Sequence, residues 1–124
     1  MNGVFVVDKP SGSTSHDVVR VLRKKLGTRA VGHAGTLDPM ATGVLVIAVG
    51  EATKLVPYLT AAEKEYETTI LLGITSETLD ADAKYFSHAP VPDDWQTNLE
   101  AALEIERRRK SQIPPNYSAI HVNG

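Results

Sequence analysis

Val44-Leu45-Val46-Ile47-Ala48-Val49 is the longest apolar run of the chain, and it lies between Gly43 and Gly50. A short continuous run of aliphatic and β-branched residues between two turn-forming glycines predicts a buried strand. The run is far too short to cross a bilayer as a helix. The fold therefore depends on which segments pair with this strand and which segment covers it.

Three other segments have the pattern of strands. Gly3–Asp8 is apolar and ends at the turn residues of Lys9–Gly12. Glu65–Leu72 alternates in the way expected of a half-buried strand. Ser118–Val122 precedes Asn123-Gly124, the strongest short signal of a hairpin turn. Together with the helices, these strands predict an α+β fold with a mixed, mainly antiparallel sheet and flanking helices.

Helices are expected both before and after the buried strand along the chain. Thr14 and Asp17 match a capping box, Gly27 is a suitable C-cap, and apolar residues between them recur at helical spacing, which predicts a helix from Ser15 to Leu26. Glu51–Tyr58 predicts a short helix that Pro57 disturbs. Asp93-Asp94-Trp95 opens a further helix, which we expect to be capped by an aspartate and to place Trp95 in the core. The acidic stretch Ser76–Asp82 is expected to be a loop.

Composition and charge narrow the class of protein. The chain has 124 residues, which suffices for one domain, and it lacks cysteine, so disulfides and thiolate metal sites are excluded. Its start does not have the pattern of a signal peptide, and we expect a soluble, cytoplasmic protein. The net charge is −2, but residues 1–60 carry seven Lys or Arg against four Asp or Glu, whereas residues 61–124 carry six against eleven. The basic surplus indicates either a phosphate-facing surface or a solvated helix face, and it consists of Arg20, Arg23, Lys24, Lys25 and Arg29.

Residues 32–43 contain three glycines and a proline and have no regular periodicity, so they predict an irregular loop. Asp38 lies in this loop between Leu37 and Pro39. Pro39 restricts the backbone of Asp38 to extended conformations, which limits where its side chain can point. A carboxylate held in this way could act in catalysis, although Asp-Pro is also common in ordinary turns.

The same loop, Gly32-His33-Ala34-Gly35-Thr36-Leu37-Asp38-Pro39-Met40-Ala41-Thr42-Gly43, resembles the catalytic motif of the TruB family of tRNA pseudouridine synthases almost letter for letter. Four other segments resemble the family's motifs, in its order and approximate spacing: Val7–Ser15, Gly50–Lys54, Lys64–Tyr66 and Gln112–Ala119. The resemblance therefore covers nearly the whole chain.

This resemblance implies an isomerase that converts uridine to pseudouridine at position 55, in the T-loop of tRNA, without a cofactor or a metal. The family's catalytic aspartate falls on Asp38, which starts cleavage of the glycosidic bond before uracil rotates and rejoins through C5. The active-site tyrosine falls on Tyr66, expected to stack on the target base and to help remove the proton from C5. The family's histidine falls on His33, expected to support the flipped-out nucleotides. An aromatic platform and a polar group in the vacated space would offset the cost of unstacking a base.

Lys9 and Lys54 are further candidates for the substrate-binding site. Each could pack near the site or contact a phosphate of the RNA, and each could equally be a solvated surface residue. The expected partner is the T-arm stem-loop of tRNA. We expect neither a membrane nor a protein partner, and we expect a monomer.

The chain departs from the family in two ways. Ala83 stands where the acidic loop of the family usually has glycine. Family members also continue well past the Asn-Gly turn with further strands, a basic residue beside the aspartate and a C-terminal RNA-binding module. The resemblance therefore implies that residues 1–124 are the N-terminal part of a single, incomplete pseudouridine synthase catalytic domain, without the rest of that domain or the RNA-binding module. We expect little independent activity.

Two other functions are consistent with parts of this pattern. A non-catalytic RNA-binding or RNA-remodelling fragment could grip the T-arm through the same motifs. A hydrolytic metalloenzyme would have to use His16, Asp17, His33 and Asp38, but their spacing fits no common set of metal ligands.

Overall fold

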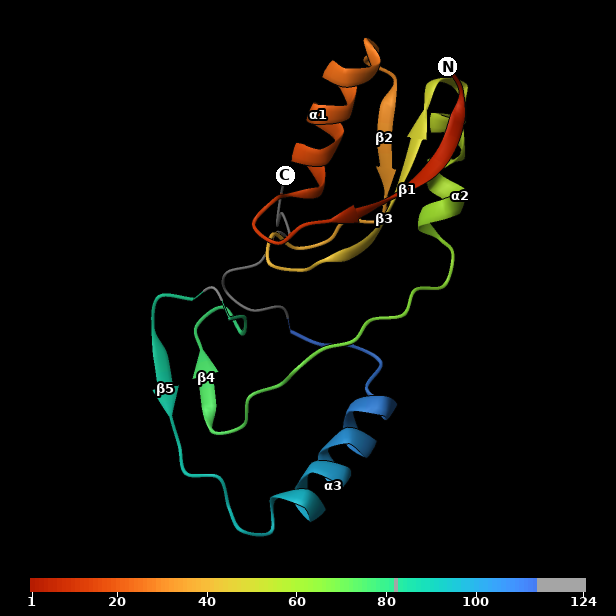
Figure 1. Ribbon diagram of the computed structural model, residues 1–124. Helices are drawn as coiled ribbons and strands as arrows, with labels where there is room; N and C mark the ends of the chain where they lie inside the picture. Colours follow the sequence, from red (N-terminus) through yellow and green to blue (C-terminus); the bar gives the residue numbers. More distant parts are fainter. Residues whose placement is uncertain (82, 114–124) are drawn as a thin grey trace. The chain divides into compact units, whose positions relative to one another are not determined.

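The computed structural model describes residues 1–81 and 83–113, which belong to two compact units, Met1–Tyr66 and Glu67–Gly124. The first unit contains three strands and two helices beside a short 3₁₀ segment, and the described part of the second contains a strand pair and one helix (Figure 1). No helix in the described part of the chain is long and apolar enough to cross a membrane.

The first unit is built on the strand that the apolar run predicts. β3 (Gly43–Val49) lies between β1 (Gly3–Lys9) and β2 (Val31–Ala34), and both neighbours pair with it in antiparallel register. Leu45, Ile47, Ala48 and Val49 are all buried. The predicted α+β class with a mainly antiparallel sheet is confirmed.

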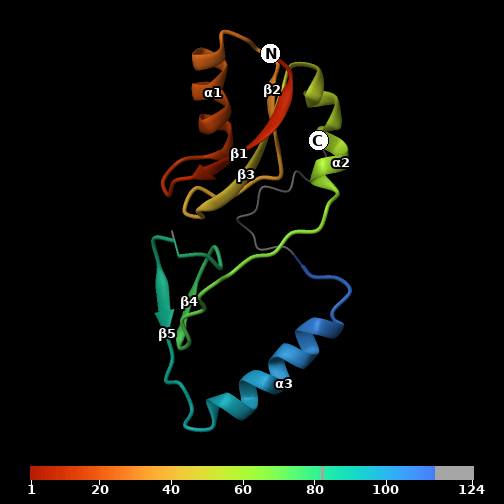
Figure 2. The same cartoon turned by 45° about the vertical axis from the view of Figure 1, so that its right-hand side comes forward.

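α1 (Ser15–Leu26) covers one face of this sheet (Figure 2). Its predicted bounds are confirmed: Thr14 and Asp17 form a capping box, and Gly27 ends the helix with a φ of 63°, a conformation that glycine adopts readily. The hydrophobic core lies between the helix and the sheet and consists of Val19, Val31, Leu45, Ile47 and Val49.

The loop that was predicted over residues 32–43 is shorter than expected, because Val31–Ala34 forms β2. Hydrogen bonding to β3 overrides the weak strand preference of this short segment, which contains a glycine. His33 lies directly opposite Ile47 in the register, so both side chains point to the face that α1 covers.

After β3 the chain forms a 3₁₀ helix, η1 (Gly50–Leu55), and then α2 (Val56–Thr60). The expectation that Pro57 would disturb a helix here is wrong. Pro57 occupies the first turn of α2, where a backbone N–H has no partner within the helix and the fixed φ of proline is favourable.

The second unit contains a two-stranded sheet, β4 (Ile74–Ser76) with β5 (Phe86–His88), and α3 (Trp95–Arg108). The strand predicted over residues 65–72 is wrong, since residues 63–71 have no regular secondary structure. An alternating pattern alone forms no strand where no neighbour completes its hydrogen bonds. Residues 77–81 form the expected turn, whereas Asp82 and the predicted strand at 118–122 lie outside the described residues.

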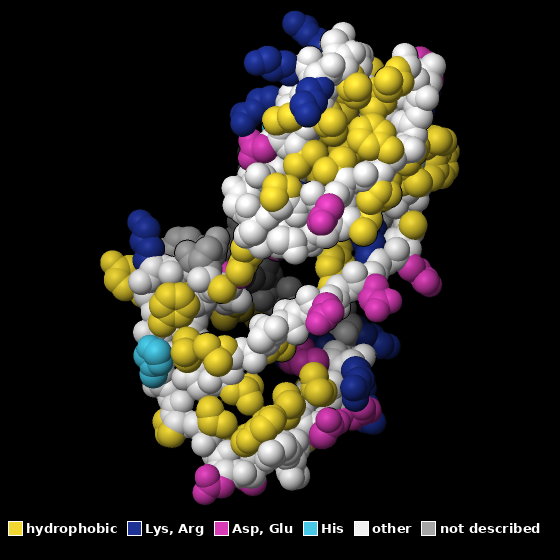
Figure 3. Space-filling view, in the orientation of Figure 1, with side chains coloured by type: hydrophobic (Ala, Val, Ile, Leu, Met, Phe, Trp, Pro, Cys, Tyr) yellow, Lys and Arg dark blue, Asp and Glu magenta, His cyan; other side chains and the backbone are white. Residues whose placement is uncertain are grey.

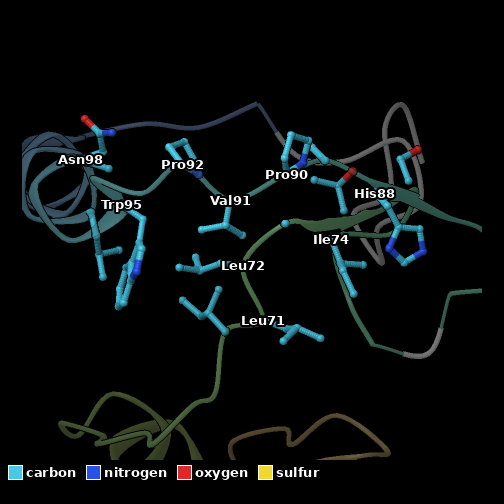
Figure 4. A pocket seen from close by; sticks show the side chains of 16 residues that line it. Leu71, Leu72, Ile74, His88, Pro90, Val91, Pro92, Trp95 and Asn98 are labelled. Atoms are coloured by element: carbon cyan, nitrogen blue, oxygen red, sulfur yellow. The ribbon is translucent and has the colours of Figure 1, made fainter.

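An apolar groove of about 530 Å³ opens in the second unit between residues 70–75, residues 87–92 and α3. Leu72 and Val91 lie in its middle, with Trp95 towards one end and His88 towards the other (Figure 4). Trp95 is 36% exposed, so the prediction that it belongs to the core is wrong. Asp94 is the N-cap residue of α3 as expected, but its side chain makes no capping hydrogen bond.

Candidate functional site

Asp38 lies in the loop formed by residues 35–42, which joins β2 to β3 and which we call the Asp38 loop. The side chain of Asp38 is exposed, and its backbone carbonyl accepts a hydrogen bond from the N–H of Ala41 at 3.0 Å. Asp38 thus begins a tight turn and presents its carboxylate to solvent. Among the described residues, no hydrogen bond or ion pair engages that carboxylate.

Ser15 fixes the loop on the N-terminal side of Asp38. The backbone N–H of Leu37 donates to Ser15 Oγ at 2.9 Å, and that hydroxyl donates to the carbonyl of Leu37 at 3.2 Å. Ser15 is 2% exposed, and the side chain of Leu37 packs against the core. Because Ser15 is the first residue of α1, the start of this helix holds the loop in place.

Lys9 fixes the loop on the other side of Asp38. Its side chain is fully buried, and Nζ donates to the carbonyls of Pro39 at 3.2 Å, Ser13 at 2.6 Å and Pro10 at 3.0 Å. The N–H of Gly12 also donates to the Pro39 carbonyl, at 2.8 Å. Three charge-assisted hydrogen bonds offset the cost of burying the lysine nitrogen.

The expectation that Lys9 could be a solvated surface residue is therefore wrong. The remaining alternatives were packing near the site and contacting a phosphate. All three N–H groups of the lysine nitrogen are directed at backbone carbonyls inside the protein. This arrangement favours packing near the site over contact with a phosphate.

His33 is half-buried at the end of β2, next to the Asp38 loop. Its Nδ1 lies 2.8 Å from the carbonyl oxygen of Gly35. A carbonyl only accepts hydrogen bonds, so we assign the proton to Nδ1, which leaves Nε2 as the ring atom available to another partner.

The segment that leads to Tyr66 passes over the start of the loop. A Cβ added to Gly35, whose φ is 99°, would lie 3.3 Å from Cε of Lys64. Nζ of Lys64 donates to the carbonyl of Thr60, near the end of α2, and to that of Ala62 at 3.0 Å. The side chain of Lys64 thus lies beside Gly35 at the start of the loop, and its amino group binds carbonyls at the end of α2. Tyr66, two residues further on, is 66% exposed.

Lys54 is exposed on η1, where Nζ lies 2.5 Å from Oε2 of Glu51. Within the described residues, no hydrogen bond or ion pair joins Lys54 or Tyr66 to the Asp38 loop. Of the residues selected from the sequence, the structure therefore connects only Lys9 and His33 directly with that loop.

Sequence reasoning missed Ser15 and Lys64. Both lie within segments that resemble family motifs, but neither is marked as a site residue by its own sequence surroundings. The only signal for Ser15 is its place at the start of a helix, and its contact with Leu37 spans 22 residues of chain.

The four residues that a metalloenzyme would have to use, His16, Asp17, His33 and Asp38, do not form a cluster of metal ligands. Two of them, Asp17 and His33, make hydrogen bonds to other groups. Asp17 accepts hydrogen bonds from the hydroxyl and the N–H of Thr14 at 2.7 Å and 2.9 Å and pairs with Arg20 at 2.6 Å. These hydrogen bonds from Thr14 lower the pKa of the Asp17 carboxyl below its ordinary value, with a smaller contribution from Arg20. In the part of the chain that the structure describes, no three His, Asp or Glu side chains gather as metal ligands.

Comparison with known proteins identifies related sequences and structures. Residues 23–124 match the model of the TruB family pseudouridylate synthase, N-terminal domain. The chain is 48% identical over its whole length to tRNA pseudouridine synthase B of Opitutus terrae, of which it covers 52%. It is 50% identical over 98% of its length to tRNA pseudouridine synthase B of Mycobacterium tuberculosis, of which it covers 41%.

Among solved structures, 96% of the chain aligns with 31% of a chain in the crystal structure of a Cbf5-Nop10-Gar1 complex, with a TM-score of 0.53 and 28% sequence identity. The chain thus spans about half or less of the curated relatives reported above. It belongs to the TruB family of pseudouridylate synthases and matches the N-terminal domain of that family.

Proposed function

We propose that this chain supplies the catalytic loop of an isomerase that converts uridine to pseudouridine in the T-loop of tRNA, at position 55. Asp38 is the catalytic residue. The observation that carries this proposal is an exposed carboxylate on a loop whose backbone is hydrogen-bonded to Ser15 on one side and to Lys9 and Gly12 on the other. Such fixation holds a reacting group in place before substrate arrives.

The reaction exchanges one bond of the nucleoside for another. The bond between N1 of uracil and C1′ of ribose breaks with help from Asp38, the base rotates, and C5 bonds to C1′. The proton on C5 is released, and N1 gains a proton, so no redox partner or external group is required. Asp38 acts at the first step, where a negatively charged carboxylate can attack or stabilise the electron-poor sugar or base.

The target uridine must leave its stack to reach Asp38, which costs a few kcal/mol. Tyr66 offsets this cost by stacking on the base, and its exposed ring is free to do so. His33 occupies space near the flipped-out nucleotides, with Nε2 available to a hydrogen-bonding partner because Nδ1 is committed to Gly35. Lys9 positions the loop, and Lys54 contacts a phosphate after exchanging its partner Glu51.

We also infer that residues 1–124 form the N-terminal part of one catalytic domain. Relatives of about twice this length support this inference. The remainder would provide a basic partner that keeps the Asp38 carboxylate charged and oriented, as well as the RNA-binding module. We place the protein in the cytoplasm as a monomer, with little activity in residues 1–124 alone.

The test is tritium release from a T-arm stem-loop RNA labelled at C5 of the target uridine. The full-length protein should release tritium, and Asp38→Asn, which keeps the size of the side chain but removes its charge, should lower the rate by at least a thousandfold. RNA binding that persists without any release by the unsubstituted full-length protein would instead establish a non-catalytic RNA-binding protein. Residues 1–124 alone, assayed in parallel, measure the contribution of the remainder.

A further inference from the structure

The outer face of α1 concentrates the positive charge of the first unit. Residues 18–30 contain five Lys or Arg and no acidic residue. Four apolar residues of α1 face the core, namely Val18, Val19, Leu22 and Leu26. The helical period therefore directs Lys24 away from the sheet and Lys25 to the side, and Arg29 follows the C-cap glycine. Figure 3 shows Lys and Arg side chains gathered over this helix.

Two of the five basic residues are already engaged within the protein. Arg20 pairs with Asp17 at 2.6 Å, and Nη2 of Arg23 donates to the carbonyl of Val31 at 2.9 Å. The other three are exposed, and the structure gives them no ion pair among the described residues; we call them the α1 cations: Lys24, Lys25 and Arg29.

We propose that the α1 cations bind phosphates of the RNA stem that adjoins the target loop. This inference rests on the proposed function and adds a contact surface to it. Exposed positive charges that are not paired with a carboxylate among the described residues suit the phosphate backbone, which positions an RNA without reading its bases.

The position of α1 indicates which part of the RNA is contacted. The helix begins at Ser15, whose hydroxyl holds the Asp38 loop, and Lys24 lies nine residues further on. At 1.5 Å per residue, Lys24 and Lys25 lie on the order of 15 Å from the loop along the helix axis, and Arg29 follows the far end of the helix. A nucleotide at Asp38 therefore belongs to the loop of the RNA, whereas phosphates at this distance belong to its stem. α1 would act as a rigid spacer between the two contacts.

The second basic run of the chain differs in its environment and offers a matched control. Arg107 and Arg108 lie within 3.6 Å and 2.8 Å of Glu104, and Arg109 lies 2.6 Å from Glu106. These three arginines are thus all paired, although they share only two carboxylates of α3. Exposed pairs of this kind contribute little to stability, so their neutralisation should leave the fold intact.

The experiment measures the affinity of the full-length protein for a T-arm stem-loop RNA at several salt concentrations. Asp38→Ala is present in every variant, so that no turnover occurs and binding is measured independently of the proposed isomerisation. The test variant carries Lys24→Gln, Lys25→Gln and Arg29→Gln, and the control carries Arg107→Gln, Arg108→Gln and Arg109→Gln. Both lose the same net charge.

We expect the test variant to bind roughly tenfold to a hundredfold more weakly at moderate salt, because each lost phosphate contact reduces the salt-dependence slope by about 1. The control should retain both affinity and slope. The loop sequence alone, as an oligonucleotide without the stem, should bind the test variant and its parent equally. Equal loss of affinity in both triple variants would show that only the net charge matters. Unchanged binding of the test variant would show that the α1 cations do not contact the RNA. Either result overturns the proposal. Failure of the proposed function would instead appear as absent tritium release by the unsubstituted protein.

Discussion

Lys9 illustrates how a single buried side chain can organise a loop from inside the protein. Its nitrogen joins two turns that are far apart in sequence, since it donates to carbonyls at residues 10 and 13 and to that of Pro39, 30 residues away. The sequence suggested a role near the site but left solvation equally open, because burial of Lys9 depends on that distant carbonyl. By contrast, Asp38 could be selected from its motif, since its loop contains all the residues that mark it.

We predict that Lys9→Met destabilises the protein by about 2–4 kcal/mol, because methionine fills a similar volume but leaves buried carbonyls without a donor. Urea unfolding of the full-length protein measures the change. Lys54→Met is the control: Lys54 is exposed and has a single ion pair, so we expect a change of less than about 1 kcal/mol. Equal stability of Lys9→Met and the unsubstituted protein would show that the buried hydrogen bonds contribute nothing.

At the scale of elements, local signals succeeded and long-range ones failed. The bounds of α1 follow from Thr14, Asp17 and Gly27, which act within a few residues of the backbone that they cap. β2 and the irregular segment at residues 63–71 were both misassigned. β2 forms because β3 lies beside it and completes its hydrogen bonds. Residues 63–71 form no strand, and no strand pairs with them in the described part of the chain. A sequence pattern does not contain that information.

The capping box of α1 makes a prediction about pH. Hydrogen bonds from Thr14 lower the pKa of Asp17 in the folded protein below its ordinary value of 3.8. The unfolded state therefore binds the proton more tightly, so the stabilisation by Asp17 is fully present above about pH 3.8 and is lost as pH falls through the folded pKa.

Asp17→Asn keeps an oxygen that can accept from Thr14 but removes the charge. The difference in unfolding free energy between this variant and the unsubstituted protein should be largest near neutral pH and should shrink below pH 3.8. Urea unfolding followed by circular dichroism across this range provides the measurement. A difference that stays constant with pH would mean that the charge of Asp17 does not stabilise the helix.

On the scale of the whole molecule, the first unit leaves much apolar surface uncovered. Val4, Val6 and Val44 are 44%, 60% and 69% exposed, and all three point to the sheet face opposite α1. Figure 3 shows hydrophobic side chains gathered over this sheet. β1 also pairs with only one strand among the described residues, so one of its edges has free backbone groups. In the second unit, α3 has no buried residue.

These exposed surfaces agree with the inference that residues 1–124 are part of a larger domain, and they predict where the rest of that domain packs. Amide hydrogen exchange, measured on residues 1–124 alone and on the full-length protein, should show similar strong protection in β3, whose two edges are already paired. In β1, residues 63–71 and α3, protection should be at least tenfold greater in the full-length protein. Equal protection of these segments in both proteins would show that they fold independently, and the exposed valines would then need another explanation.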